Sequence, residues 1–502
     1  MKSDIKLERL SGLEMGKLVN DGELVPTDII EYFFDRIEKL NPILTAYTYT
    51  RKEEALLAAR QLEKRLAEGQ YCGPFAGVPV CLKDFLPSKK GWTNSHGGVP
   101  ILTAVDAYDS EFCKAAEILG AIVIGKTNAP AFGFSGACEN VQYGATANPF
   151  DLNRTSGGSS GGTASAVAAG LAIFGEGGDA GGSIRIPAGW CNLFGFKPSL
   201  GTVSSVCRPD AWAATHPYCF NGCLTKTVAD SATMLTQMAQ YNPRDPFSLP
   251  INATKDFSEL MEQSVFNFRV AVTFDFDLWP IVDHRIKQLT WEIANKLKAV
   301  GVEVELVHFN FKHTLSDIMR TWAVWISVDT ALDMMEWKKH GLDLEGEYSD
   351  QVPQEFLKFN QQASQIDIRA FRHFNEVKTD ILDNFENVLS EYDLILSPTA
   401  ICLPMKDSQH GHCNTPIDGK IPDRETDFIS FAETPLANFV GYPAASVPGG
   451  TIEENGQQIP IGVQLIGRQY HDEDVLAMSR TLEKINPWID NFLPVWEKFD
   501  KR

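Results

Sequence analysis

Residues 157–190 read GGSSGGTASAVAAGLAIFGEGGDAGGSIRIPAGW. Two glycine-rich runs, at 157–162 and 177–182, flank an apolar segment of small residues. The first run has three possible interpretations: a flexible linker, a cradle for a phosphate group, or a loop whose backbone and hydroxyl groups take part in chemistry. Glycine–serine linkers are usually flanked by polar residues, but this run leads directly into TASAVAAGLAIF, which predicts a tightly packed helix. A linker is therefore disfavoured.

A phosphate cradle has little support. No lysine follows these glycines, and no G-x-G-x-x-G lies between a predicted strand and a predicted helix. GAIVIGKT, residues 120–127, fits G-x-x-x-x-G-K-[ST] letter for letter. Its four middle residues are apolar and mostly β-branched, so they predict a strand rather than a loop that could wrap a phosphate. We interpret this match as chance.

The second glycine-rich run favours chemistry. Glycines let backbone N–H groups approach a ligand closely, so Ala180, Gly181, Gly182 and Ser183 can direct several donors at one oxyanion. Ser183 then stands where a nucleophile is needed, and a nucleophilic serine requires a base.

Lys83 is the best candidate for that base. GGSSG, residues 157–161, matches the G-x-S-x-G elbow as a string, but the preceding NPFDLNRT is not the apolar strand that an elbow requires. The only Ser-x-x-Lys is Ser3 to Lys6, near the end of the chain, and none of the ten histidines has a recognisable signature. Lys83 ends the apolar stretch GVPVCLKD, and burial there would depress its pKa.

The rest of the chain predicts alternating strands and helices. Helices are expected at 26–42, 52–69, 109–120 and 283–300, and strands at 77–84, 121–128, 268–274, 302–307, 394–398, 444–450 and 460–467. This order predicts an α/β fold with a large mixed, mostly parallel twisted β-sheet covered by helices on both faces. We expect a single domain over 1–502, with an N-terminal helical region at 1–70 packed on it and a catalytic core at 77–205.

Composition and charge exclude several classes of partner. The chain has 502 residues, of which 44% are hydrophobic and 22% charged, and a formal net charge of −20. That charge repels a phosphate backbone or an anionic membrane surface, so we expect neither nucleic acid nor membrane as a partner. The N-terminus has no apolar signal segment, and the apolar stretch at 164–175 is shorter than a bilayer requires.

The cysteines indicate a reducing compartment. Ten cysteines are scattered singly, without a C-x-x-C pair, so we expect reduced thiols in a cytoplasmic protein. QHGHC, residues 409–413, offers His410, His412 and Cys413 as possible metal ligands, but no fourth ligand stands at a familiar spacing. We interpret it as a polar surface loop, with a metal site as the alternative, and expect no metal or organic cofactor.

The sequence resembles the amidase signature family. The most specific match is residues 157–204, with supporting matches at GVPVCLKDF (77–85), GAIVIGKTNAP (120–130), YGATANPFD (143–151), GYPAASVPGG (441–450) and PIGVQLIGR (460–468). The resemblance implies the amidase signature fold and a Ser-Ser-Lys triad. The nucleophile falls on Ser183, the bridging serine on Ser159 and the lysine on Lys83.

The resemblance also implies roles around the triad. The oxyanion donors fall on the backbone of Ala180, Gly181, Gly182 and Ser183, and a cis peptide bond is expected between Gly158 and Ser159. Asp179 and Arg185 are expected to act as scaffold for the loop, and Phe134 and Ser135 to lie in the substrate-binding region. The chain departs from the family pattern at Gly178, where a hydroxyl residue is frequent, and at Asn192, where glycine is frequent.

We therefore expect hydrolysis of an amide C–N bond through an acyl-enzyme, with a small-molecule amide and water as partners, and a homodimer as one possible assembly. Carbamates and esters remain possible substrates. The alternatives are an amidotransferase A-type subunit that releases ammonia from glutamine, and an inert binding protein of the same fold. Substrate choice is expected in residues 131–140, in 207–223 with Trp212, in the helix with Trp322 and Trp325, and in 400–431. Their aromatic content favours an apolar or aryl group.

Overall fold

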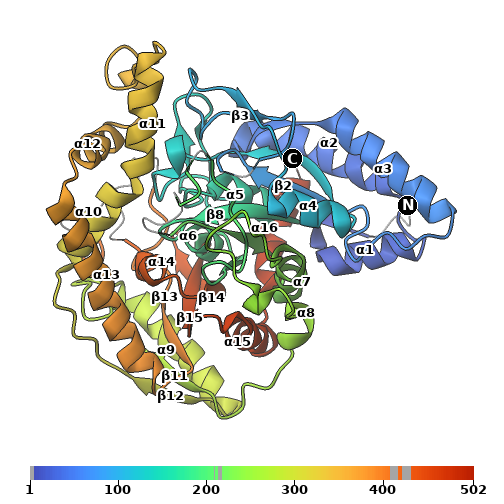
Figure 1. Cartoon of the computed structure of the whole chain (residues 1–502). Helices are drawn as coiled ribbons and strands as arrows, with labels where there is room; N and C mark the ends of the chain where they lie inside the picture. The colour runs from blue at the N-terminus through green and yellow to red at the C-terminus, as the bar shows by residue number, and fades with distance from the viewer. Residues whose placement is uncertain are drawn as a thin grey trace.

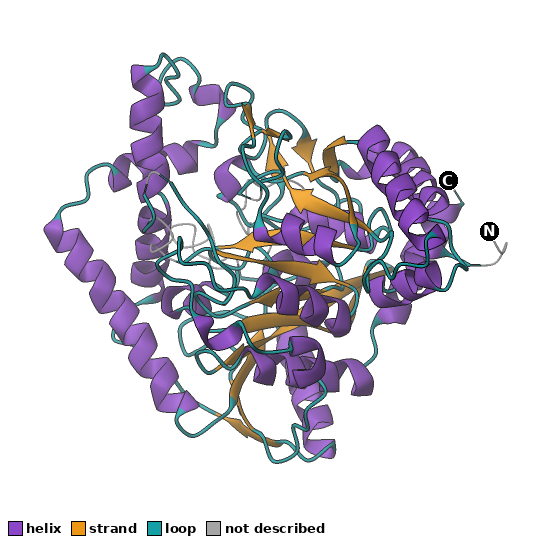
Figure 2. Ribbon diagram, turned by 45° about the vertical axis from the view of Figure 1, so that its right-hand side comes forward, coloured by secondary structure: helices purple, strands orange, loops and turns teal. Residues whose placement is uncertain are grey.

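The architecture is organised around one long mixed sheet (Figures 1 and 2). The structure is a computed structural model that describes residues 5–86, 88–208, 210–212, 218–406, 416–420 and 431–501. Eleven strands of these residues form the sheet, in the spatial order β1 (Tyr47–Thr50), β5 (Ile122–Thr127), β2 (Pro79–Lys83), β8 (Phe174–Asp179), β10 (Phe220–Thr225), β9 (Phe194–Lys197), β14 (Ala444–Glu454), β15 (Gln457–Gly467), β13 (Leu394–Pro398), β11 (Arg269–Val272) and β12 (Glu303–Leu306). Two small hairpins, β3 (Thr93–Asn94) with β4 (Ala104–Val105) and β6 (Glu139–Asn140) with β7 (Gly144–Ala145), lie outside it.

The prediction of a mixed α/β sheet is confirmed, but the expectation that it is mostly parallel is wrong. Strands pair in parallel only where β2 meets β5 and β8, and where β11 meets β12 and β13; the other six ladders are antiparallel. One cause is the tight hairpin between β14 and β15. Its turn residues Asn455 and Gly456 both have positive φ, as an Asn-Gly hairpin turn requires, and such a turn forces antiparallel pairing.

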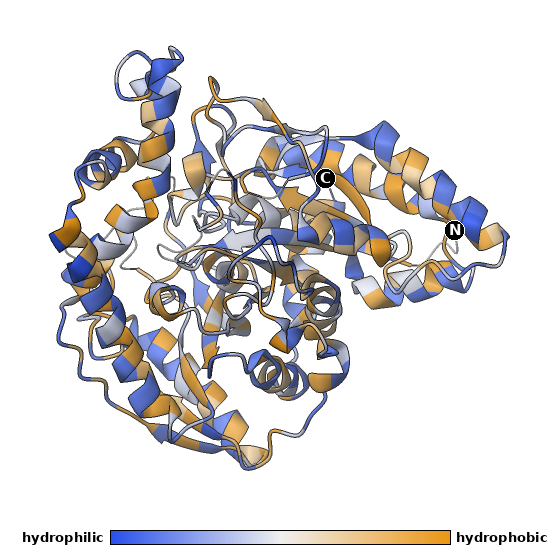
Figure 3. Ribbon diagram, viewed as in Figure 1, coloured by the Kyte–Doolittle hydropathy of each residue, from blue (hydrophilic) through white to orange (hydrophobic). Residues whose placement is uncertain are grey.

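Helices surround this sheet (Figure 2). They are α1 (Gly12–Asn20), α2 (Pro26–Leu44), α3 (Lys52–Ala67), α4 (Glu111–Ile118), α5 (Gly161–Ala168), α6 (Arg185–Trp190), α7 (Val228–Met238), α8 (Phe257–Leu260), α9 (His284–Ala299), α10 (Leu315–Ile326), α11 (Val328–Lys339), α12 (Gln354–Ala363), α13 (Ile368–Leu389), α14 (Pro435–Val440), α15 (Asp472–Ile485) and α16 (Leu493–Asp500). Helices α10 to α13 gather on one side of the sheet and α1 to α3 on the other (Figure 1). The outer helices α2, α3 and α13 carry hydrophobic and hydrophilic residues side by side, as amphipathic surface helices do (Figure 3). None of the helices in the described parts of the chain has the length and apolarity needed to cross a membrane.

The small-residue segment after the first glycine-rich run becomes a fully buried helix, and a central strand follows it. All eight residues of α5 are buried, and the chain then turns through Gly170 at φ +71° before β8 begins. Close packing explains the glycines, because a Cβ on Gly162 would lie 2.3 Å from the backbone nitrogen of Asn128. GAIVIGKT supplies β5, and its Lys126 forms an ion pair with Asp106, so its resemblance to a phosphate-binding loop is a chance match.

Candidate active site

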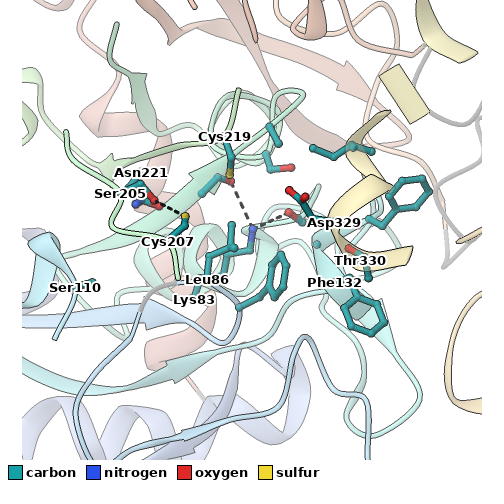
Figure 4. Close-up of a pocket in the computed structure, with 18 of the residues that line it drawn as sticks. Lys83, Leu86, Ser110, Phe132, Ser205, Cys207, Cys219, Asn221, Asp329 and Thr330 are labelled. Carbon is teal, nitrogen blue, oxygen red and sulfur yellow. Dashed lines mark hydrogen bonds between the residues drawn. The ribbon is translucent and has the colours of Figure 1, made fainter. Parts of the chain in front are cut away.

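Lys83 and Ser159 form a buried hydrogen-bonded pair. Lys83 is the last residue of β2, Ser159 stands two residues before α5, and the two residues are 1% and 2% exposed. The Lys83 Nζ donates a hydrogen bond of 2.7 Å to the Ser159 Oγ and a longer one, of 3.5 Å, to the carbonyl oxygen of Gly178. Figure 4 shows the Lys83 side chain in the centre of the site with both hydrogen bonds dashed. The pair is placed to exchange a proton.

The turn before α5 holds Ser159 in place. The peptide bond between Gly158 and Ser159 is cis, as the family resemblance implies. A Cβ on Gly158 would lie 2.6 Å from the carbonyl oxygen of Ser135, so only glycine fits there. The backbone N–H of Ser160 donates to the carbonyl oxygen of Ser183 over 3.2 Å, which fastens this turn to the loop that carries the second serine.

That second loop connects β8 to α6 and is organised around the carboxylate of Asp179. The carboxylate accepts the backbone N–H of Gly182 at 2.7 Å and that of Ile184 at 3.2 Å. It also accepts the Nε and Nη2 of Arg185, both at 2.9 Å, and the side-chain amide of Asn438 at 2.9 Å. Burial alone would raise the pKa of Asp179, but Arg185 and Asn438 outweigh burial and hold that pKa well below its usual range.

The polar groups of the loop backbone divide into two sets. All four carbonyl oxygens accept hydrogen bonds: Ala180 from the Trp322 Nε1 at 2.8 Å, Gly181 from the Thr434 Oγ1 at 2.7 Å, Gly182 from the Ile186 N–H at 2.7 Å, and Ser183 from the Ser160 N–H at 3.2 Å. The Gly182 N–H is used by Asp179, so the prediction that it faces an oxyanion is wrong. The N–H groups of Ala180, Gly181 and Ser183 donate to none of the residues that the structure describes. These three N–H groups remain for a ligand.

Glycine is required at both central positions of the loop. Gly182 has a φ of +124°, and a Cβ there would lie 1.9 Å from the Thr434 Oγ1. A Cβ on Gly181 would lie 2.6 Å from the indole ring of Trp322. Thr434 and Trp322 thus approach the loop so closely that a side chain cannot be accommodated.

Burial dominates the electrostatics of the pair. Desolvation lowers the pKa of Lys83, because the buried ammonium loses its hydration, and the nearby carboxylate of Glu176 opposes this shift. Glu176 is 0% exposed, and burial raises its pKa in turn. Its Oε2 lies 3.5 Å from the backbone nitrogen of Lys83, while its Oε1 has no hydrogen-bond partner among the described residues. A lysine in such surroundings gives up its proton more readily than a free one.

A cavity of about 350 Å³ opens beside the pair. Lys83, Ser159 and Ser183 all line it, together with Gly178 and Ala180. The aromatic part of the wall consists of Phe85, Tyr108, Phe132, Phe134, Trp322 and Phe356. In Figure 4 the wall with Ser205 and Cys207 lies on one side of Lys83, and the wall with Phe132 and Thr330 lies on the other. The cavity has the size and the mostly apolar lining of a small-molecule site.

Several residues expected at the substrate site lie elsewhere. Phe134 and Trp322 line the cavity, but Ser135 does not; its Oγ accepts the backbone N–H of Ala137 at 3.1 Å. Trp212 packs edge-on against Phe247, and Trp325 against Phe374 with ring centroids 4.4 Å apart. The described residues of 400–431 do not line the cavity, and QHGHC lies outside the described residues.

The sequence did not predict the residues that form hydrogen bonds with the loop but lie far from it in the chain. Besides Thr434 and Asn438, the Gln464 side chain accepts a hydrogen bond of 2.5 Å from the Arg185 Nη1. Gln464 belongs to PIGVQLIGR, a motif to which the sequence assigns no role, whereas TPLANF, residues 434–439, offers no local signal. Glu176 was also missed, although a buried carboxylate in the middle of a glycine-rich strand is itself unusual.

Among the residues that the structure describes, one cluster outside the cavity has side chains of the kind that bind metals. Asp283, His284 and Asp418 each place one such atom within 4.8 Å of the others. The Asp283 carboxylate is already bound by the Arg285 guanidinium at 2.6 and 3.0 Å, and the His284 ring is largely exposed. We assign this cluster a structural role at the start of α9.

Comparison with known proteins identifies the family of this chain. The family model described as Amidase matches residues 28–476. The chain belongs to the amidase signature family. It is 28% identical to the A-type subunit of the glutamyl-tRNA(Gln) amidotransferase of Thermodesulfovibrio yellowstonii, over 96% of this chain and 99% of that one. It is 27% identical to an acylamidase of Rhodococcus erythropolis, over 96% and 97%. The crystal structure of a bacterial aryl acylamidase of this family superimposes with a TM-score of 0.91 at 32% identity, over 98% of this chain and 99% of that one. Membership and these relatives support an amide-hydrolysing enzyme.

Proposed function

We propose that this chain hydrolyses aryl amides through an acyl-enzyme on Ser183, with Lys83 as general base and Ser159 as the proton relay. The observation that carries the proposal is the 2.7 Å hydrogen bond between the Lys83 Nζ and the Ser159 Oγ, in a cavity that Ser183 also lines. Burial supports it further, because it favours the neutral amine that a base must be.

The reaction follows the usual course of acyl transfer. Neutral Lys83 takes a proton from Ser159, which takes one from Ser183, and the Ser183 Oγ attacks the carbonyl carbon of the amide. The carbonyl oxygen gains the negative charge, which the free N–H groups of Ala180, Gly181 and Ser183 stabilise. The proton returns through Ser159 to the leaving nitrogen, and the C–N bond breaks. Water then attacks the acyl-enzyme by the same route and releases the carboxylic acid.

The aryl preference rests on the walls of the cavity. Phe132 and Phe356 stack with ring centroids 4.7 Å apart, and Phe134 stacks on Trp322 at 5.9 Å. These rings offer faces and edges to a flat ligand. The similarity to a bacterial aryl acylamidase supports the same conclusion. Glutamine, the substrate expected of an ammonia-releasing subunit, carries a carboxylate that needs a cation. The lining includes no arginine among the described residues, and Lys114 is paired with Glu111.

The test is hydrolysis of 4-nitroacetanilide, with acetamide and glutamine as comparison substrates. We expect turnover of the anilide, little ammonia from glutamine, and loss of at least about 10³-fold in kcat for Ser183→Ala. A fluorophosphonate should label Ser183, as peptide mapping would show. Label on Ser159 or Ser160 would overturn the assignment of roles. Ammonia release from glutamine at a comparable rate would favour the amidotransferase alternative, and a failure to label any serine would favour an inert protein.

A further inference from the structure

The wall of the cavity opposite Ser205 is formed by two consecutive helices. Trp322 and Ile326 near the end of α10, and Asp329 and Thr330 at the start of α11, all line it. Ile326, Asp329 and Thr330 follow Trp322 by four, seven and eight residues, which is the spacing of residues on one face of a helix. Ser327 joins the helices, and Ala331 donates its N–H to the Ser327 carbonyl oxygen at 2.8 Å, so this face runs almost continuously across the junction. Asp329 therefore stands on the same wall as Trp322.

Asp329 is the one charged group of this lining without a partner among the described residues. Lys83 is bonded to Ser159, and Lys114 and Glu111 pair with each other at 2.7 Å. Asp109 accepts the backbone N–H of Lys90 at 3.0 Å. The Asp329 carboxylate makes no hydrogen bond or ion pair with any described residue. The cavity therefore offers one uncommitted negative charge.

The surroundings of Asp329 suit a cation. The side chain lines the cavity and remains accessible to solvent. Burial, followed by the nearby carboxylates of Asp210 and Asp333, raises the pKa of Asp329 to about 6, so the group is largely ionised at neutral pH. A cation there would relieve the repulsion among these carboxylates. The aromatic rings on the adjoining wall add a second attraction, because ring faces favour a positive charge.

We propose that Asp329 selects aryl amides that carry an ammonium group, by forming an ion pair with that group while the ring lies against the aromatic wall. This inference rests on the proposed aryl-amide hydrolysis and names its substrate class more narrowly. Asp329 acts in recognition and takes no part in the chemical steps. Since the pair remains partly exposed, we expect it to improve binding by about fivefold.

The test measures inhibition of 4-nitroacetanilide hydrolysis by benzylamine, 2-phenylethylamine and 3-phenylpropylamine. Each amine is compared with the neutral alcohol of the same length, and the quantity of interest is the ratio of the two inhibition constants. Three chain lengths are used so that one of them brings the ammonium group within reach of the carboxylate. We expect a ratio of about five in favour of the amine in the wild type, and a ratio near one in Asp329→Asn.

Asp333→Asn is the matched control. Asp333 lies one turn further along α11, close enough to Asp329 to affect its pKa, but it does not line the cavity. Its replacement removes the same charge and should leave the ratio almost unchanged. Equal loss in both variants would show a general effect of negative charge and overturn the proposal, as would the absence of an amine preference in the wild type. If 4-nitroacetanilide is not hydrolysed, the proposed function fails by itself. Protection of Ser183 from fluorophosphonate labelling by the same amines and alcohols then still measures the preference.

Discussion

Replacement of Asp179 by asparagine tests the support of the catalytic loop most directly. Asp179 and Arg185 are both 0% exposed, and the carboxylate receives two hydrogen bonds from the guanidinium besides those from the Gly182 and Ile184 backbone. Asparagine keeps the shape of the side chain but removes its charge. The guanidinium is then left buried without its counterion.

Loss of one partner from a buried ion pair costs about 3–5 kcal/mol. The entropy of unfolding is about 2.1 cal/mol/K per residue, or about 1 kcal/mol/K for a chain of 502 residues. Asp179→Asn should therefore lower the Tm by about 3–5 °C. Because the Gly182 N–H loses its anionic acceptor, the loop should also lose its fixed orientation. We expect kcat/KM for 4-nitroacetanilide to fall by about 10²-fold or more.

Differential scanning fluorimetry and urea denaturation measure the stability. Two further variants test whether the effect comes from the buried ion pair. Asp367→Asn removes the same charge from an exposed pair, in which Arg369 contacts Asp367 at 2.5 and 2.9 Å, and should leave the Tm almost unchanged. The double variant Asp179→Asn, Arg185→Met removes both buried charges and should be more stable than the sum of its single variants implies, by at least about 1 kcal/mol. Strict additivity, or an unchanged Tm for Asp179→Asn, would refute the role assigned to this pair.

Three further variants test the base and the turn before Ser159. Lys83→Arg should lower kcat by about 10²–10⁴-fold, because a guanidinium keeps its proton at any working pH, and an active arginine variant would mean that another group is the base. Glu176→Gln removes the carboxylate that raises the pKa of Lys83, so this pKa should fall further and the acid limb of the pH profile of kcat/KM should move to lower pH; a shift to higher pH would contradict the reasoning. Gly158→Ala places a Cβ 2.6 Å from the Ser135 carbonyl oxygen, and we expect about 1–3 kcal/mol of lost stability in urea denaturation together with reduced labelling by the fluorophosphonate. Unchanged labelling would show that the turn tolerates the shift.

The residues that can be read from the sequence are those in short motifs at the ends of strands. Lys83 ends the apolar run that predicts β2. Asp179 ends β8, a strand that was not predicted, and its place in the site was expected only from the family resemblance. The direction of strand pairing could not be read in the same way, because it depends on which distant strands meet. The hydrogen-bond partners of Arg185 could not be predicted for the same reason. Thr434 and Gln464 are more than 240 residues away in the sequence, and no local pattern around either residue predicts a hydrogen bond to Arg185.

The aromatic residues show why the cavity itself was only partly predictable. Trp322 and Trp325 lie on one helix, three residues apart, and composition alone cannot separate them. The structure directs the Trp322 indole at the Ala180 carbonyl oxygen, while Trp325 packs into the helices behind it against Phe374. The distinction arises from tertiary packing of α10, which places one ring against the glycine loop and the other in the core.

Trp322 also links the two halves of the site. Its Nε1 holds the carbonyl oxygen of Ala180, and its ring lines the cavity where the aryl group is proposed to bind. Because Trp322 and Thr434 occupy the carbonyl oxygens of Ala180 and Gly181, the N–H groups of those residues and of Ser183 are the polar groups that the loop can offer to a ligand. A loop with free donors and occupied acceptors favours negative charge, which in the proposed mechanism develops on the substrate oxygen only as Ser183 attacks. A ring held against Trp322 would therefore steady the same indole that fixes the loop, so that binding of the aryl group and stabilisation of the oxyanion share one support.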